Sequence, residues 1–254
     1  MILVVDVGNT NTVLGVYDGE TLLNHWRLAT RPEATVDEYG ILSRNLFSLA
    51  RIDSSKISGV IIASVVPPLD PILRQMAVQY FHLQPMFVEP GVKTGLAVKY
   101  DPPQDVGADR IVNGVAAWKK YGGPLIVVDF GTATTFDAIS KKGEYLGGVI
   151  APGIVISSEA LFERAARLPR VDIRPSRKVI GTSTVGSMQS GLFYGYVGLV
   201  EGLIVRMKKE LGSDSKVVAT GGQAEMIAKG TDVIDHLEPD LILEGLRIIY
   251  ELNV

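Results

Sequence analysis

A pattern of residues suited to binding phosphate occurs twice in the chain. Residues 2–8, with the sequence ILVVDVG, match residues 125–131, with the sequence LIVVDFG, and both copies continue with small polar residues. Glycine and small hydroxyl residues in a tight turn expose N–H groups that bind phosphate oxygens. An aspartate before such a turn can bind Mg²⁺. One copy alone could be a simple turn, but two copies in register favour a pair of phosphate-binding turns facing each other across a cleft.

A third glycine-rich turn occupies residues 220–224, with the sequence TGGQA. It follows a predicted strand over residues 216–219 and opens a predicted helix. The N-terminus of a helix favours anions, and glycine lets the backbone approach a ligand closely. This turn suggests a contact with adenosine, although Gly-Gly before a helix is common.

A candidate proton acceptor lies in the segment 100–110, with the sequence YDPPQDVGADR. The two prolines stiffen a loop that delivers Asp109 and Arg110 to the start of a predicted helix. A carboxylate there can accept a proton from a substrate hydroxyl, and the arginine beside it can bind a carboxylate or phosphate through two hydrogen bonds. An aspartate in a first helical turn also stabilises the helix dipole, so the spacing alone leaves both interpretations open.

Composition excludes several other chemistries. The chain has 254 residues and no cysteine, which removes disulfides, cysteine nucleophiles and zinc–thiolate sites. Its three histidines are far apart, and its net charge of −3 provides no basic excess for nucleic acid. The longest uncharged stretch, between Lys178 and Glu201, is too polar for a membrane span. We therefore expect a cytoplasmic protein that binds neither nucleic acid nor membranes.

The elements that must position these residues alternate between strands and helices. Predicted strands cover residues 2–7, 12–17, 21–28, 59–65, 86–88, 125–128, 134–140, 144–150, 216–219 and 233–234. Predicted helices cover residues 32–52, 71–81, 107–121, 153–167, 185–211, 222–229 and 239–252, and residues 92–106 are predicted to be a loop. Each half opens with a strand, an Asp-x-Gly turn and two more strands. The repeat thus predicts two halves that meet near residue 115.

Three motifs together resemble those of type III pantothenate kinase. They are Asp6-x-Gly8-Asn9-Thr10, Gly107-x-Asp109-Arg110 and Asp129-x-Gly131-Thr132-Ala133, in the family's order and at compatible spacing. The resemblance implies an α/β protein with the acetate and sugar kinase/Hsp70/actin-like fold. Residues 1–115 and 116–254 would be its two ribonuclease H-like halves, with an interdomain cleft. The implied reaction transfers the γ-phosphoryl group of ATP to pantothenate, giving 4'-phosphopantothenate in the first step of coenzyme A biosynthesis.

The resemblance also implies a role for individual residues. ATP would be bound by Asp6, Val7, Gly8, Asn9, Thr10, Asn11, Thr12, Val13 and Thr132. Pantothenate would be bound by Tyr100, Gly107, Ala108, Asp109, Arg110 and Thr184, with Asp109 as the catalytic base. Asp6 would lie on the magnesium side, and Asp129 would bind a monovalent cation, K⁺ or NH₄⁺.

Members of this family are dimers, and the resemblance implies a homodimer through the second half. The predicted helix over residues 185–211 carries glycines at intervals of three and four: Gly191, Gly195, Gly198 and Gly202. Their cost to the helix is offset either by a partner copy or by close packing inside one chain. Two rival functions remain open at this stage, a phosphohydrolase of the same fold and a non-catalytic regulatory protein.

Overall fold

The computed structural model describes residues 1–254, and the chain forms two compact units. Unit 1 comprises Met1–Leu96, Asp101–Ala116 and Ile242–Val254; unit 2 comprises Ala97–Tyr100 and Ala117–Leu241. The chain passes from unit 1 to unit 2 after Ala116, close to the expected boundary at residue 115. The division differs from the expected halves in two places, because the last segment belongs to unit 1 and residues 97–100 belong to unit 2.

Unit 1 is built on a five-stranded sheet. Its strands are β1 (Ile2–Val7), β2 (Asn11–Asp18), β3 (Thr21–Ala29), β4 (Gly59–Ser64) and β5 (Met86–Phe87), and its helices are α1 (Val36–Leu49), α2 (Asp70–Phe81), most of α3 (Ala108–Tyr121) and α7 (Leu241–Glu251). The strand order is β3-β2-β1-β4-β5, with β1 antiparallel to β2 and parallel to β4. The β1–β2 turn and the end of β4 therefore lie at the same edge of the sheet.

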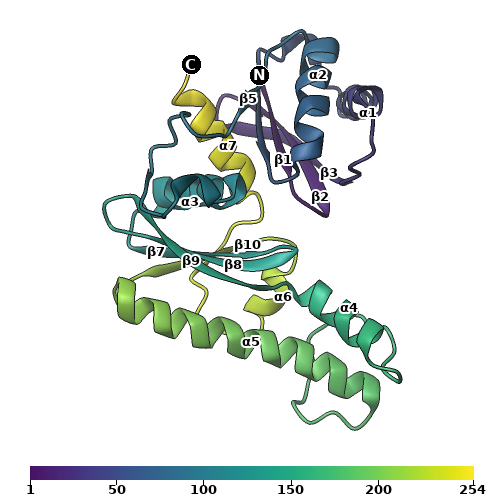
Figure 1. Ribbon diagram of the computed structural model, residues 1–254, viewed down its shortest axis with the longest axis vertical. Helices are drawn as coiled ribbons and strands as arrows, with labels where there is room; N and C mark the ends of the chain where they lie inside the picture. Colours follow the sequence, from purple (N-terminus) through teal and green to yellow (C-terminus); the bar gives the residue numbers. More distant parts are fainter. The chain divides into compact units, whose positions relative to one another are not determined.

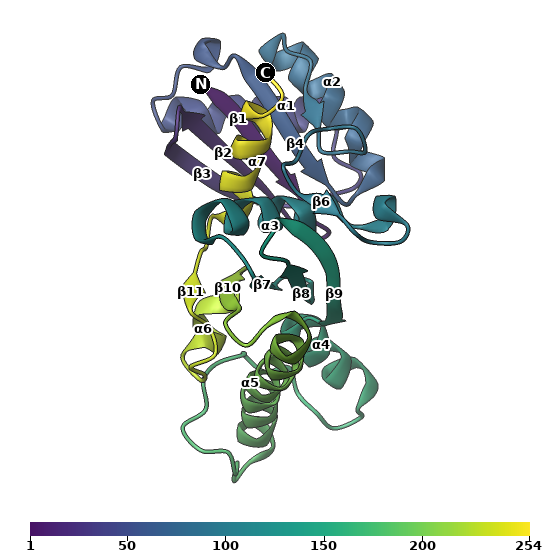
Figure 2. The same ribbon diagram turned by 90° about the vertical axis from the view of Figure 1, so that its left-hand side faces the viewer.

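Both faces of this sheet are covered. Alternate residues of β1, including Leu3 and Val5, join a core with Phe47 of α1 and Leu73 of α2. The yellow helix α7 lies across the other face (Figure 2), where a Cβ placed at Gly15 would contact the Leu243 side chain at 3.1 Å. The apolar run at residues 2–5 of β1 follows from this burial on both faces.

Helix α1 is shorter than the predicted helix over residues 32–52, because a capping box fixes its start. The Thr35 hydroxyl accepts the Glu38 N–H at 3.2 Å, and the Glu38 carboxylate accepts the Thr35 N–H at 2.8 Å. These reciprocal bonds satisfy donors that would otherwise lack partners at the helix N-terminus. The residues before Thr35 consequently lie outside the helix.

Unit 2 repeats the arrangement of unit 1. Its strands are β6 (Ala97–Val98), β7 (Leu125–Phe130), β8 (Ala133–Ile139), β9 (Glu144–Pro152), β10 (Lys216–Thr220) and β11 (His236–Leu237), and its helices are α4 (Ile154–Arg164), α5 (Thr184–Leu211) and α6 (Ala224–Ala228). The strand order is β11-β10-β7-β8-β9-β6. Apart from the added β6, this is the order of unit 1, so the repeat predicted from the sequence is confirmed in the topology.

The core of unit 2 lies between its sheet and α5, which runs along one face of the sheet (Figure 1). Ile126 and Val128 of β7 and Phe136 of β8 pack with Val200 and Ile204 of α5. Side chains alternate along a strand, so Leu125 and Val127 of β7 and Val218 of β10 point to the opposite face, where they are also fully buried. No helix of the structure has the combination of length and apolar composition that crossing a bilayer requires.

Candidate active site

The β1–β2 turn forms the first candidate phosphate site. The Gly8 N–H donates to the Asn11 carbonyl at 2.9 Å and closes the turn, while Asn9 and Thr10 at its tip are exposed. Thr12 and Val13 are buried at the start of β2. The exposed tip is therefore the part of this segment that can meet a ligand, and the buried residues set its shape.

Thr30, which the sequence did not single out, holds this turn in place. Its hydroxyl donates to the Gly8 carbonyl at 2.7 Å and lies 2.9 Å from the Thr12 hydroxyl, and its N–H donates to the Thr10 carbonyl at 3.0 Å. Thr30 directly follows β3, the strand paired with β2. The pairing of β2 with β3 places this threonine opposite the turn, and no local sequence pattern signals that position.

Asp6 and Val7 end β1. Asp6 is half-buried and stands between Val13 of β2 and Ala63 of β4, whereas Val7 is fully buried. The Val7 carbonyl accepts the Val65 N–H at 3.0 Å, which continues the β1–β4 pairing past the end of the strand. The Asp6 carboxyl group thus belongs to the sheet edge that carries the turn.

Asp109 lies in the first turn of α3, close to this edge. A Cβ placed at Gly107 would lie 2.5 Å from one oxygen of Asp109 and 3.7 Å from a methyl group of Val65. The same Asp109 oxygen accepts the Arg110 N–H at 2.9 Å. Glycine at position 107 therefore lets the carboxyl group fold back over the start of the helix.

Burial raises the pKa of the Asp109 carboxyl above its ordinary value, against the lowering effects of the Arg110 N–H bond and the Arg110 charge. A carboxylate with a raised pKa is a stronger base than an exposed one. Ala108 and Gly107 beside it are half-buried, and Arg110 is buried. The predicted segment 107–110 thus forms one structural feature at the start of α3, and its carboxyl group is the member that can accept a proton.

The β7–β8 turn is the counterpart of the first turn. The Gly131 N–H donates to the Ala133 carbonyl at 3.0 Å, and Thr132 at the tip is exposed. The Thr132 carbonyl accepts the Gly153 N–H at 3.0 Å, and a Cβ at Gly153 would overlap it at 2.2 Å. Glycine at position 153 brings the start of α4 directly against this turn.

The third glycine turn packs against Asp129. Gly221 has a φ of +93°, and a Cβ there would lie 2.5 Å from an Asp129 oxygen and 2.6 Å from the Phe130 nitrogen. Asp129 is also opposite Thr220 of β10 in the sheet register. The second and third turns, which the sequence predicted separately, therefore lie together beside the half-buried Asp129 carboxyl group.

A cavity adjoins this group of turns. Its volume is about 340 Å³, and Gln223, from the third turn, lines it together with Ser158 and Glu159 of α4 and Arg170. The lining also includes the apolar residues Val155, Val171 and Ile173, and a cavity with both kinds of side chain beside a glycine turn is consistent with the adenosine contact suggested by the sequence.

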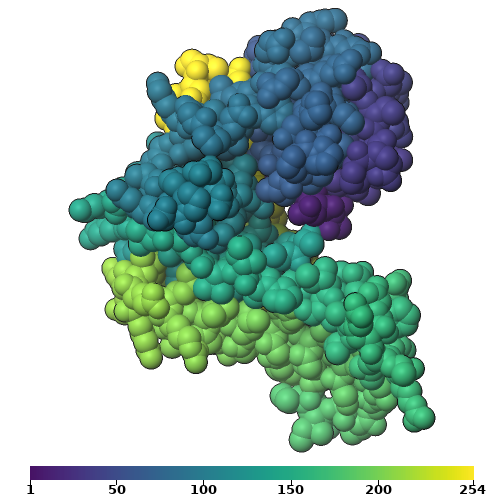
Figure 3. Space-filling view, viewed as in Figure 1, coloured from purple at the N-terminus to yellow at the C-terminus, as the bar shows by residue number.

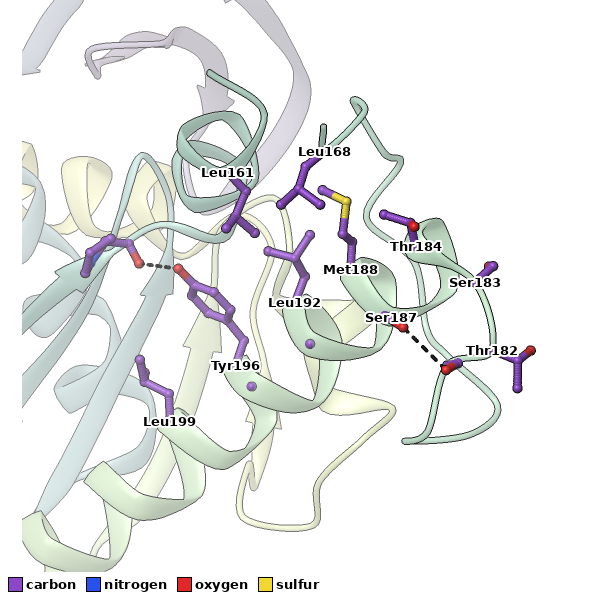
Figure 4. Close-up of a pocket in the computed structure, with 14 residues that line it drawn as sticks. Leu161, Leu168, Thr182, Ser183, Thr184, Ser187, Met188, Leu192, Tyr196 and Leu199 are labelled. Atoms are coloured by element: carbon purple, nitrogen blue, oxygen red, sulfur yellow. Dashed lines mark hydrogen bonds between the residues drawn. The ribbon is translucent and has the colours of Figure 1, made fainter. Parts of the chain in front are cut away.

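Tyr100 and Thr184 occupy different parts of unit 2. Tyr100 is half-buried after β6, whereas Thr184 is exposed on the first turn of α5. Thr184 lines a cavity of about 1060 Å³ between α4 and α5. In Figure 4 the apolar side chains of Leu161, Met188 and Leu192 point toward one another in this cavity, with Thr184 at its rim.

Comparison with known proteins identifies the family. The model of the family described as type III pantothenate kinase matches residues 2–206. A type III pantothenate kinase of Koribacter versatilis is 59% identical and that of Halalkalibacterium halodurans 56% identical; the matches cover 100% of this chain and 96% and 100% of those proteins. The chain belongs to the type III pantothenate kinase family.

Solved structures agree with the type III pantothenate kinase assignment at the level of the fold. A Campylobacter jejuni protein described as a Baf family transcriptional activator has a TM-score of 0.64 at 22% identity, covering 99% of this chain and 98% of its own. The activator of 2-hydroxyisocaproyl-CoA dehydratase from Clostridium difficile, with bound ADPNP, has a TM-score of 0.55 at 10% identity, covering 98% and 93%. The chain has the predicted acetate and sugar kinase/Hsp70/actin-like fold.

The acidic residues of this pantothenate kinase family member are dispersed. Nowhere do three histidine, aspartate or glutamate side chains gather closely enough to hold a metal ion. Mg²⁺ often uses only one or two carboxylates together with substrate phosphate oxygens. Asp6 beside the first turn and Asp129 beside the second fit that donor pattern.

Proposed function

We propose that this protein transfers the γ-phosphoryl group of ATP to the terminal hydroxyl of pantothenate, giving 4'-phosphopantothenate in the first step of coenzyme A biosynthesis. The observation that carries the proposal is the Asp109 carboxyl group at the start of α3, with its raised pKa and its place near the edge that carries the first phosphate turn. Family membership supports the identity of the substrate and of the phosphoryl donor.

The two repeated turns bind the phosphates of ATP. Asn9 and Thr10 of the first turn and Thr132 of the second are exposed, and Asp6, Val7, Gly8, Asn11, Thr12 and Val13 shape the first turn and its flanks. Phosphoryl transfer passes through a loose transition state, so catalysis depends on positioning and on neutralising charge. Turns fixed by Thr30 and Gly153 supply donors whose positions are set before ATP binds.

Asp109 accepts the proton of the pantothenate hydroxyl as this oxygen attacks the γ-phosphorus. Arg110 is suited to the pantothenate carboxylate, because a guanidinium group can bind a carboxylate through two hydrogen bonds. Tyr100, Gly107 and Ala108 complete the proposed pantothenate site. Thr184, which lines the cavity between α4 and α5, is assigned to this site on family membership alone.

Two cations neutralise the charge that ATP brings to the site. We assign Mg²⁺ to the side of Asp6 and a monovalent cation, K⁺ or NH₄⁺, to Asp129. The donor chemistry fits, since each carboxyl group lies beside a turn that can bind phosphate. Bound cations lower the electrostatic cost of bringing phosphates close to these carboxylates.

The proposed reaction is tested by measuring ADP release with and without pantothenate. Release that depends on pantothenate is expected. Release without pantothenate would instead identify a phosphohydrolase, and no release under any condition would favour a binding or regulatory role. A panel of other small hydroxyl compounds serves as the control for acceptor specificity.

The monovalent cation gives a separate prediction. Replacing K⁺ with Na⁺ is expected to lower the rate of ADP release sharply, and Asp129→Ala is expected to remove this dependence together with most of the activity. Asp214→Ala, which removes an exposed carboxylate from a turn of the same unit, is the control. Equal rates in Na⁺ and K⁺ buffers would contradict the assignment to Asp129.

We also propose a homodimer formed through α5. A Cβ placed at Gly191, Gly195 or Gly198 meets no atom within 4 Å, so packing inside the chain does not explain these glycines. Figure 3 shows green atoms of α5 exposed on one face of unit 2. A second copy that approaches this stripe closely would offset the cost of the glycines. We place the enzyme in the cytoplasm, because a chain without cysteine suits a reducing compartment.

A further inference from the structure

A buried pair, Asp137 and Tyr145, has no role in the mechanism above. Asp137 of β8 is 1% exposed and Tyr145 of β9 is fully buried. The Tyr145 hydroxyl donates to one Asp137 oxygen at 2.6 Å, and the Thr135 hydroxyl lies 3.4 Å from the other. Burying a carboxyl group is costly unless hydrogen bonds compensate it. Such a pair fixes the direction of both side chains.

The backbone beside Tyr145 is irregular. The β8–β9 pairing shifts register between Ala138 and Ile139, where Ala138 is opposite Gly147 and Ile139 is opposite Tyr145. Gly147 has a φ of +119°, a conformation that favours glycine. A bulge of this kind redirects the side chains next to it.

Tyr100 rests on this part of β9. A Cβ at Gly147 would lie 3.5 and 3.6 Å from two carbons of the Tyr100 ring, and the rings of Tyr100 and Tyr145 are 6.4 Å apart at an angle of 59°. The Lys99 N–H donates to the Tyr145 carbonyl at 2.8 Å, which anchors the backbone immediately before Tyr100. Tyr100 is thus held through its backbone and through one side of its ring.

We propose that Asp137 and Tyr145 are positioning residues for pantothenate, acting through Tyr100. The Asp137 hydrogen bond fixes the Tyr145 ring, and that ring together with Gly147 sets the orientation of Tyr100. This inference rests on the proposed function, in which Tyr100 lines the pantothenate site. An aromatic ring held in its bound orientation before the substrate arrives loses less entropy on binding.

Tyr145→Phe tests the inference, because it removes the hydroxyl and keeps the ring. We expect the KM for pantothenate to rise by about 5–10-fold, the factor associated with one lost hydrogen bond. The kcat at saturating pantothenate and the KM for ATP should stay within about twofold of the wild type. Asp137→Asn, which retains an acceptor for the Tyr145 hydroxyl, should raise the same KM by a smaller factor and provides a second route if the first variant folds poorly.

A double-mutant cycle with Tyr100→Leu shows whether the pair acts through Tyr100. Tyr145→Phe should add no further increase in the KM for pantothenate when Tyr100 is already replaced. An equal increase in both backgrounds would overturn the inference, as would an unchanged KM in both Tyr145→Phe and Asp137→Asn. A fall in kcat together with a rise in the KM values for both pantothenate and ATP would indicate general structural damage and would also overturn the inference.

The same cycle separates this inference from the proposed function. If Tyr100→Leu leaves the KM for pantothenate unchanged, Tyr100 does not contact the substrate, and the pantothenate site itself has to be revised along with the inference. If Tyr100→Leu raises this KM and Tyr145→Phe does not, only the positioning role fails. Wild-type ADP release that depends on pantothenate supplies the reference for both comparisons.

Discussion

At the scale of the residue, Asp109 is the side chain whose replacement is most informative. Asp109→Asn keeps the size of the side chain and an acceptor for the Arg110 N–H, but it cannot take a proton from the substrate. We expect kcat to fall by about 10²–10⁴-fold, the usual contribution of a general base. ATP affinity, measured by calorimetry, should change little because the phosphate turns are untouched.

Asp105→Asn is the matched control for this substitution, since Asp105 is an exposed carboxylate in the segment just before α3 and should keep normal activity. If Asp109→Asn retains more than about a tenth of the wild-type kcat, the decrease in rate is smaller than the loss of a general base would cause. That result would indicate that Asp109 has only a structural role at the start of the helix.

The burial of Asp109 also predicts a pH dependence of stability. Because its pKa is raised in the folded state, the folded protein binds this proton more tightly than the unfolded chain. The contribution of Asp109 to stability is therefore fully present below the pKa that this carboxyl has in the unfolded chain. This contribution is lost as the pH rises through the pKa that the carboxyl has in the folded protein. Asp109→Asn should melt at a higher temperature than the wild type near neutral pH, and the difference should shrink as pH falls through the raised pKa. Melting curves at several pH values measure this, and a variant less stable at neutral pH would contradict it.

Individual residues differ in how far the sequence could predict them. The Asp-x-Gly repeat made Asp6 and Asp129 candidate residues because the pattern is local and occurs twice. Asp109 stayed ambiguous from spacing alone, since its burial depends on Gly107 and Val65, which meet only in the folded chain. Thr30 was missed because its role arises from the pairing of β2 and β3.

At the scale of the element, the glycine turn after β10 is a sensitive point. Gly221→Ala should cost about 1–3 kcal/mol of stability for its strained φ, and more for the contact with Asp129 and Phe130. We expect a lower melting temperature and a KM for ATP raised several-fold. Gly222→Ala is the matched control, because a Cβ there meets no atom within 4 Å. Similar behaviour of the two variants would contradict the close packing of this turn on Asp129.

Elements were predictable where the pattern is long and missed where it is short. The strands of both hairpins and the helix α5 follow from continuous apolar runs and helical spacing. The two-residue strand β6 lay within a predicted loop, and β11 was expected at residues 233–234 rather than His236–Leu237. Such short strands are defined by their partners, β9 and β10, and not by their own composition.

At the scale of the whole molecule, the proposed dimer gives the clearest prediction. Gly195→Glu adds a charged side chain where the isolated chain has open space, so the fold should tolerate it while a partner copy would not. Light scattering at micromolar concentration should give the mass of a dimer for the wild type and of a monomer for the variant. Ser48→Glu, at an exposed position of α1, is the control. A wild-type monomer, or a dimer of the glutamate variant, would contradict the proposal.

The division into two units was predictable from the repeat, whereas the path of the chain through them was not. A repeat shows where the second copy begins, and the crossing after Ala116 lies close to that point. The placement of the last segment depends on contacts between residues far apart in the sequence. A Cβ at Gly59 would overlap the Tyr250 ring, and one at Gly245 would overlap the Val112 carbonyl. No local sequence pattern predicts such contacts.

The position of α7 has a consequence for the order in which the protein matures on the ribosome. Leu243, Leu246 and Ile249 of α7 are buried, and part of what they cover is the sheet made first. The N-terminal sheet thus emerges early but keeps one apolar face uncovered until α7 has been synthesised. Unit 2 has all its strands by Leu241, so it can complete its core sooner. During synthesis the N-terminal sheet is therefore accessible to chaperones, and prone to aggregation, for longer than unit 2. A chain whose synthesis stops before α7 would be released with one face of this sheet uncovered.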